Sequence, residues 1–406
     1  MTPTKTLATR TLATVALALT AVGAGAGAQA DEWDVTGFVG LDSRTFWEDE
    51  RFEGQDDGFN ASLHVQPEFY WRSDDGRQRV SLVAFGRYDN QDDERSHVDL
   101  RQAYWGYDGD SWDVNAGFNK VFWGVAESRH LVDVINQTDL VEDLDQEDKL
   151  GQPMVNVNLQ RDYGRFELYV MPWFRERTFP GAEGRFRSSL PVDTDNPIYE
   201  SSDKDRHTDV AFRYSHYFGD VDVGAYVFDG TSRDPNFVVA DEGDRLIPVY
   251  EQMTQVGVDL QYTRESWLWK FEGIRRASDR ESFNAAVGGL EYTFYGVGGR
   301  AADVGVLFEY LYDGRGASAP PTAFDDDIFV GARLALNDSS DTSLLAGAAI
   351  DTETHETFFN LEAQRRFGDN VTVDLRLRAF SNAAPGDALY SFEQDDYLQL
   401  RVSWYY

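Results

Sequence analysis

The last twelve residues of the chain are the feature that most constrains its fold. Side chains of an extended strand alternate between two faces. In residues 395–406 one face is apolar or aromatic and the other is mostly polar: the first carries Leu398, Leu400, Val402, Trp404 and Tyr406, and the second Gln399, Arg401, Ser403 and Tyr405. Such a strand would leave an aggregation-prone edge at the end of an open sheet. The alternation therefore predicts closure into a barrel with an apolar outer wall.

The first 30 residues have the three parts of a secretory signal peptide. Lys5 and Arg10 form a basic region, residues 12–22 are apolar, and Ala28-Gln29-Ala30 matches a small-x-small cleavage site. We therefore predict that residues 1–30 are removed on export and that residues 31–406 form one β-barrel domain. The apolar run is shorter than the roughly 20 residues of a membrane-spanning helix. No later stretch reaches that length, so any membrane insertion has to use strands.

The charge of the chain is strongly negative. Its 406 residues include 71 Asp and Glu against 37 Lys and Arg, a formal net charge of −34, and there is no cysteine. An acidic surface of this kind is typical of proteins from high-salt organisms, and attraction of cations is the other interpretation. Such a charge disfavours a nucleic-acid partner, which needs a basic face. The lack of cysteine excludes thiol catalysis and cysteine-ligated metal sites.

Short turns and longer loops alternate along the chain, as in an up-and-down outer-membrane barrel. The short connections are residues 73–77, 108–110, 161–164, 218–220, 264–266, 296–303, 337–341 and 367–370. The longer or more charged ones are residues 48–58, 90–96, 122–152, 175–206, 230–248, 278–282, 313–325, 351–356 and 381–395. Eight plus nine connections predict an all-β, antiparallel transmembrane barrel of 18 strands with both termini in the periplasm. The alternative is 16 strands, because the regions around Ala301 and Val238 are ambiguous.

Strand periodicity supports the barrel but does not orient it. Val256, Val258 and Leu260, for example, alternate with Gln255 and Asp259. A soluble β-sandwich would alternate in the same way, with its apolar face turned inward. The signal peptide, the terminal aromatic residue and the rhythm of the loops favour an apolar face that points outward.

The third long connection, residues 122–152, is unusual because its first half is apolar, with Leu131, Val132, Val134 and Ile135. We predict that it folds into the barrel and narrows a pore; the alternative is an external lid with a small core of its own. The candidate constriction residues are Glu127, Arg129, His130, Asp133, Asp139, Glu142, Asp143 and Asp145. The candidate lumenal arginines are Arg101, Arg175, Arg177, Arg213, Arg376, Arg378 and Arg401. Facing acidic and basic groups would orient dipolar solutes and tune ion selectivity, or the arginines would brace the wall by pairing with carboxylates such as Asp374.

Catalytic and cofactor motifs are incomplete. Asp143, Asp145 and Glu147 have the spacing of a calcium loop, but Asp148 stands where that loop needs glycine and Met154 where it needs a glutamate. A calcium site at the protein surface is left open at these residues, and no other cofactor or metal is indicated. Ser215 and His216 are adjacent on a strand and so point to opposite faces, which disfavours a hydrolase. We therefore predict that the chain is not an enzyme.

The C-terminal strand resembles that of bacterial outer-membrane proteins, whose final aromatic residue is part of the signal read by the barrel assembly machinery. Residues 31–406 resemble channels of the porin superfamily, and Trp123-Gly124 and residues 132–136 resemble uncharacterised proteobacterial barrels. The resemblance implies the outer membrane of a Gram-negative bacterium, export through the periplasm, contact with outer-membrane lipid and assembly through Tyr406. It implies a homotrimer if the chain follows general porins, and a monomer if it follows substrate-specific 18-stranded channels.

Three functions are consistent with these observations. The leading prediction is a channel for passive or facilitated diffusion of small hydrophilic solutes. The second is a structural or scaffold barrel with a plugged lumen that binds a partner, and the third is an outer-membrane hydrolase. Conductance of the purified protein separates the first from the second.

Overall fold

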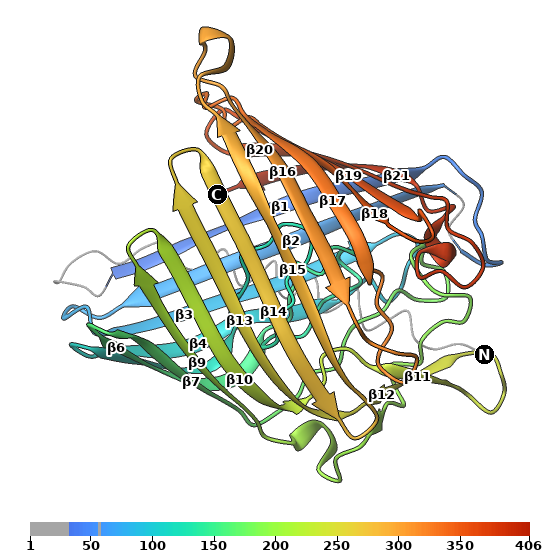
Figure 1. Cartoon of the computed structure of the whole chain (residues 1–406), viewed down its shortest axis with the longest axis horizontal. Coiled ribbons are helices and arrows are strands. Elements are labelled where there is room, and N and C mark those ends of the chain that lie inside the picture. Colours follow the sequence, from blue (N-terminus) through green and yellow to red (C-terminus); the bar gives the residue numbers. More distant parts are fainter. Residues whose placement is uncertain (1–31, 56–57) are drawn as a thin grey trace, which may run out of the picture.

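The computed structural model describes residues 32–55 and 58–406. The predicted signal peptide, residues 1–30, lies outside these residues. The described chain forms one closed antiparallel barrel of 18 strands (Figure 1). Its strands are β1 (Glu32–Phe46), β2 (Phe59–Arg72), β3 (Gln78–Asp89), β4 (Val98–Asp108), β5 (Trp112–Asn119), β6 (Gln152–Arg161), β7 (Gly164–Met171), β9 (Asp209–Phe218), β10 (Val221–Thr231), β13 (Gln252–Arg264), β14 (Trp267–Ser278), β15 (Ser282–Phe294), β16 (Asp303–Asp313), β17 (Asp326–Ala335), β18 (Ser343–Asp351), β19 (Thr357–Phe367), β20 (Val371–Ser381) and β21 (Tyr397–Tyr405).

Each barrel strand pairs with the next one along the chain, and the barrel closes where β21 pairs with β1. This closing register runs from Phe38 opposite Tyr405 to Phe46 opposite Tyr397. Closure satisfies the backbone groups of what would otherwise be two open sheet edges. The prediction of 18 strands is confirmed and the alternative of 16 is wrong.

A small second sheet accounts for one of the two ambiguous regions. It consists of β8 (Ile198–Tyr199), β11 (Asn236–Val239) and β12 (Leu246–Tyr250), all within long loops. Val238 therefore lies in a strand outside the barrel. Ala301 lies in the turn between β15 and β16, where the 3-10 helix η2 (Val297–Gly299) is found. The other two 3-10 helices, η1 (Lys204–Arg206) and η3 (Tyr390–Phe392), also lie in connections.

The apolar face of the strands points outward. On β21, Leu398, Leu400, Val402 and Trp404 are 38–51% exposed, whereas Gln399 and Ser403 are 3% and 2% exposed. This arrangement is that of a lipid-facing wall around a polar interior, and it rules out a sandwich with a buried apolar face. No helix in the described part of the chain is long and apolar enough to span a membrane.

Exposed aromatic rings gather at both ends of the outer wall. Near the short turns these include Trp112, Tyr163 and Tyr217, and near the long loops Trp47, Phe59 and Tyr88. Two aromatic belts of this kind mark the two interfaces of a membrane barrel. One short turn, between β9 and β10, has Gly219 at a φ of 64°, which a residue without a side chain adopts at little cost.

Candidate pore constriction and lumenal cavity

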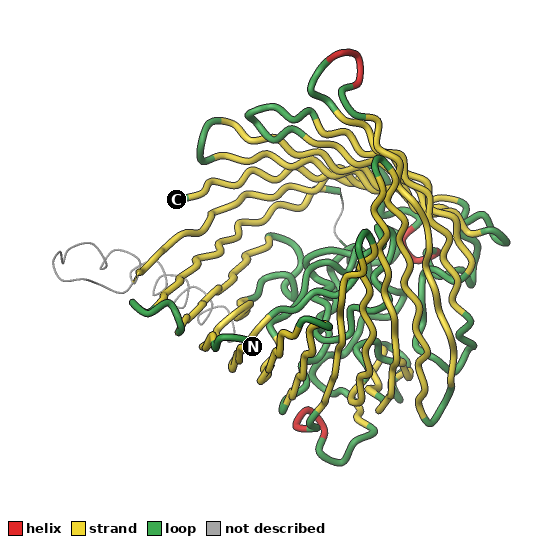
Figure 2. The backbone as a smooth tube through the Cα atoms, turned by 60° about the vertical axis from the view of Figure 1, so that its left-hand side comes forward, coloured by secondary structure: helices red, strands yellow, loops and turns green. Residues whose placement is uncertain are grey.

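The connection between β5 and β6, residues 120–151, lies inside the barrel, as the prediction of an inward-folded loop requires (Figure 2). We refer to it as the lumenal loop. Val132 and Ile135 are fully buried and Val134 is 2% exposed. They form one apolar core with inward-pointing side chains of the wall, among them Tyr169, Met171, Tyr226, Phe228, Ile274, Leu307 and Leu311. Burial of this apolar run holds the first half of the loop against the wall.

Two buried wall carboxylates also hold the first half of the lumenal loop. Glu272 on β14 and Glu309 on β16 are 0% and 1% exposed. Backbone N–H groups of the loop donate to them: those of Val125, Ala126 and Val132 to Glu272 at 2.7, 3.0 and 3.2 Å, and those of Glu127 and Ser128 to Glu309 at 2.8 Å. These charge-assisted hydrogen bonds satisfy loop backbone that the barrel shields from water. The sequence did not predict a role for either glutamate, although acidic residues at inward strand positions beside apolar ones were a usable signal.

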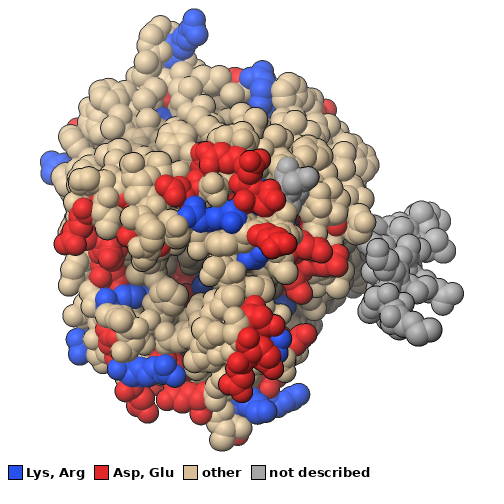
Figure 3. All heavy atoms as spheres, turned by 90° about the vertical axis from the view of Figure 1, so that its right-hand side faces the viewer, with Lys and Arg blue, Asp and Glu red and all other residues tan. Residues whose placement is uncertain are grey.

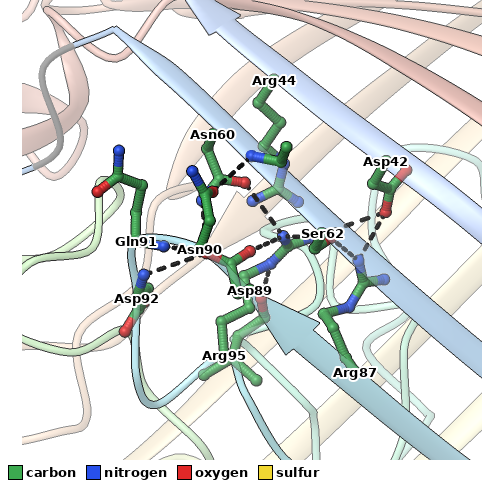
Figure 4. A network of polar contacts seen from close by, with 12 residues as sticks. Asp42, Arg44, Asn60, Ser62, Arg87, Asp89, Asn90, Gln91, Asp92 and Arg95 are labelled. Carbon is green, nitrogen blue, oxygen red and sulfur yellow. Dashed lines mark hydrogen bonds and ion pairs between the residues drawn. The ribbon is translucent and has the colours of Figure 1, made fainter.

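The acidic second half of the lumenal loop contacts arginines on the opposite side of the barrel. Arg87 on β3 donates to Glu142 at 2.6 Å and to Asp42 on β1 at 2.7 Å. Figure 4 shows Arg87 beside Asp42 and Ser62, in a network that extends to Asp89 and Arg95. Arg401 also pairs with Asp42, at 2.9 Å. The network ties the loop to β3 and to β1 and β21, the two strands that close the barrel.

Three predicted arginines meet predicted acidic residues directly. Arg376 and Arg378 on β20 both pair with Asp143, and Arg378 also donates to Asp145 at 2.7 Å. Arg101 on β4 donates to Asp139 at 2.5 Å. The two groups are therefore in contact here and do not face each other across an open gap. Arg376 and Arg378 thus occupy two of the three carboxylates, Asp143 and Asp145, at which a surface calcium site was left open.

The other four predicted arginines pair elsewhere. Their partners are Asp99 for Arg175 at 2.8 Å, Asp234 for Arg177 at 2.6 Å, Asp259 for Arg213 at 2.8 Å, and Asp42 for Arg401. Asp374 makes no ion pair with any described residue; Glu362 on β19 instead pairs with Arg376 at 3.3 Å. All seven arginines thus have a carboxylate partner, which is the bracing arrangement.

A cavity of about 570 Å³ remains between the lumenal loop, the wall and the overlying loops. Five constriction candidates line it: Glu127, Arg129, His130, Asp133 and Asp145. Glu127 pairs with Arg333 at 2.7 Å, Asp133 with Lys149 at 3.1 Å, and His130 lies 4.0 Å from Glu272. Asp139, Glu142 and Asp143 do not line this cavity. Figure 3 shows acidic and basic side chains side by side around the middle of the face at the right of Figure 1.

His97, in the connection before β4, adds a titratable contact that the sequence analysis missed. Its Nδ1 lies 3.1 Å from the carbonyl oxygen of Arg95, and its Nε2 lies 3.4 Å from Asp139 and 3.7 Å from Glu142. Burial lowers the pKa of His97, but the hydrogen bond that its ring donates to Asp139 and the charges of both carboxylates outweigh this effect, so the pKa is raised above 6.5. Protonated His97 therefore helps Arg87 and Arg101 to hold the acidic half of the loop.

We expect the contribution of His97 to stability to depend on pH. Because its folded-state pKa is raised, the contribution is fully present below pH 6.5 and is lost as the pH rises through the folded-state pKa. Urea unfolding of the wild type and of His97→Gln at pH 5 and pH 9 measures it. The two proteins should differ more at pH 5, and a difference that does not change with pH would show that protonation of His97 does not contribute to stability.

Comparisons with known proteins bear on the fold. No protein-family model matches the sequence, and no curated protein matches it. Among solved structures, Wzi of Escherichia coli, described as an outer-membrane protein involved in group 1 capsule assembly and a carbohydrate-binding β-barrel, aligns with 99% of this chain and 89% of its own at 12% identity and a TM-score of 0.53. OccAB1 of Acinetobacter baumannii aligns with 92% of this chain and 96% of its own at 8% identity and a TM-score of 0.52. At these identities the likeness concerns the fold alone.

Proposed function

We propose that this chain is an outer-membrane channel through which small hydrophilic solutes diffuse. The observation that carries the proposal is the lumenal loop, which lies within an apolar-walled barrel and leaves a cavity lined by charged side chains. A channel needs a lipid-facing exterior and a polar path of limited width. In this proposal the chain reaches the outer membrane through the periplasm, and Tyr406 is read by the assembly machinery.

The predicted site residues take two different roles in this proposal. Asp139, Glu142 and Asp143 hold the lumenal loop through arginines of the wall. Glu127, Arg129, His130, Asp133 and Asp145 line the cavity and face the solute. The second group would therefore control selectivity and the first group the position of the constriction.

A scaffold barrel with a plugged lumen is the second candidate. It is favoured by the tight packing of the lumenal loop, in which Val132 and Ile135 have no exposed surface. Under that function the loop would be a fixed plug, and the charged face above it would bind a partner. The two candidates differ in whether the barrel conducts ions.

Single-channel conductance in planar bilayers tests the proposal. The full mature chain, refolded into detergent and added to one side, should produce discrete current steps. Heat-denatured protein in the same detergent is the control. If the folded barrel inserts into the bilayer and carries no current, the channel proposal is wrong and the scaffold function stands.

A further inference from the structure

Four arginines gather on one side of the cavity, each from a different part of the chain. They are Arg129 of the lumenal loop, Arg177 of the β7–β9 connection, Arg276 of β14 and Arg315 of the β16–β17 connection, and all four line the cavity. We call them the arginine cluster. Asp234 pairs with Arg177 at 2.6 Å and with Arg276 at 3.1 Å. Asp313 pairs with Arg315 at 2.7 Å and with Arg129 at 3.1 Å.

The arginine cluster has more positive charge than its partners neutralise. Two carboxylates serve four guanidinium groups, and no other carboxylate of the described residues forms an ion pair with any of them. Four positive and two negative charges leave an excess of two positive charges. This excess lies in a chain whose formal net charge is −34. Bracing the overlying loops would need only one arginine for each carboxylate.

All four arginines act electrostatically on the same carboxylate, Asp234. Burial raises the pKa of Asp234, but Arg177, Arg276, Arg315 and Arg129 together hold it well below its usual range. All four guanidinium groups are therefore close enough to stabilise one negative charge. Within a concave cavity, their combined field attracts an anion more strongly than the same charges would on an open surface.

Several N–H donors of the arginine cluster have no partner among the described residues. Arg129 uses only Nη1, which donates to Asp313 and to the carbonyl oxygen of Phe324. Arg276 uses Nε and Nη1, and Arg177 uses Nε and Nη2. The remaining nitrogens can donate to an oxyanion, the acceptor that a planar guanidinium group matches best.

Apolar side chains lie directly beside the arginine cluster. Ile274 is two residues before Arg276 on the same face of β14, and Phe324 and Phe329 line the same cavity. The buried ring of Phe283 lies under the guanidinium groups of Arg315 and Arg276, at 4.7 and 5.6 Å. A ligand held by the cluster would therefore place the rest of its surface against hydrocarbon.

We propose that the arginine cluster binds a small organic anion, one oxyanion group attached to an apolar body, as the solute that the channel carries. The two excess positive charges and the free donors recognise the oxyanion, and Ile274, Phe324 and Phe329 contact the apolar body. The inference rests on the proposed function, since it names the class of solute for the same cavity. It accounts for the excess of guanidinium groups over paired carboxylates at this one place in the cavity.

Binding of benzoate to the detergent-solubilised full mature chain tests the inference. Isothermal titration calorimetry should detect benzoate, and should detect benzyl alcohol or acetate only weakly, since each lacks one half of the recognised chemistry. Arg276→Gln and, separately, Arg177→Gln should weaken benzoate binding by about tenfold, the effect of one lost charge-assisted contact. Arg365→Gln is the control, because Arg365 lies on the outer wall, is 45% exposed in its side chain and pairs with Asp338 at 3.3 Å.

Each outcome of this experiment decides a separate point. Equal binding of benzoate and benzyl alcohol, or benzoate binding unchanged in both correctly folded cluster variants, would overturn the inference. Benzoate binding by a barrel that does not conduct would reject the channel and keep the anion site. Conductance with no preference for benzoate over benzylamine, together with no benzoate binding, would keep the channel and reject the anion site.

Discussion

Replacing Glu272 with leucine should release the first half of the lumenal loop and raise single-channel conductance about twofold or more. The substitution removes the acceptor for the N–H groups of Val125, Ala126 and Val132, which are then left without partners in a shielded interior. Each such buried donor costs about 1–3 kcal/mol. The loss is therefore large relative to the few kcal/mol that hold a loop in place.

Glu291→Leu is the matched control for this substitution. Glu291 is also an inward carboxylate, on the adjacent strand β15, opposite Leu268 of β14. Glu291 makes no hydrogen bond with the lumenal loop in the part of the chain that the structure describes. The conductance of the Glu291→Leu variant should therefore equal that of the wild type. Limited proteolysis of the loop in the folded barrel gives a second measurement that does not require a channel. If neither variant changes conductance or cleavage, the apolar core of the loop holds it without Glu272.

The architecture could be predicted because it depends on local patterns. The period of two along strands such as β13 and β21, together with short turns, located all 17 connections and therefore the number of strands. Period alone does not decide which face is outward. The orientation was predicted from the signal peptide, the terminal aromatic residue and the rhythm of the loops, and the exposure of Leu398 and Leu400 confirms it.

Strand β16 shows where periodicity was insufficient. Leu307 and Leu311 point inward and are 2% and 1% exposed, while Phe308 and Tyr310 point outward, so both faces of the strand are apolar. The inward leucines are explained by Val132 and Ile135 of the lumenal loop, which pack against this side of the wall. The sequence predicted the loop and its apolar half, but not the strands on which that half packs.

Pairing across the barrel could not be predicted from the sequence. Arg87 meets Glu142, which is 55 residues away, and Arg378 meets Asp143, which is 235 residues away. Which side chains meet depends on how the loop turns inside the closed barrel and on the position of each strand residue along the barrel axis. The sequence therefore indicated the charged groups that line the lumen. The ion-pair partner of each group could be identified only from the three-dimensional structure.

Arg87→Met should destabilise the barrel by about 3–5 kcal/mol, because it leaves the buried Glu142 without its arginine and removes one of the arginines that pair with the buried Asp42. The side chains of Arg87 and Asp42 are each 1% exposed, and that of Glu142 is 4% exposed. Urea unfolding of the protein refolded in lipid vesicles, followed by tryptophan fluorescence, measures the change in the free energy of unfolding. Arg77→Met is the matched control, since Arg77 pairs at 3.2 Å with Asp110, which is 92% exposed, and such a surface pair contributes at most about 1 kcal/mol.

Arg87→Met should also change the dependence of stability on pH. Burial raises the pKa of Glu142, but Arg87 and Arg95 outweigh it and lower the pKa from 4.5 to about 2. The stability that this ion pair provides is therefore present above pH 4.5 and is lost as the pH falls toward 2. In Arg87→Met the loss over this range should be smaller, because the principal cause of the low pKa of Glu142 is absent. A loss of less than about 1 kcal/mol at neutral pH, with an unchanged pH profile, would show that Arg95 and Arg401 compensate for Arg87 and that the seam of the barrel holds the loop without it.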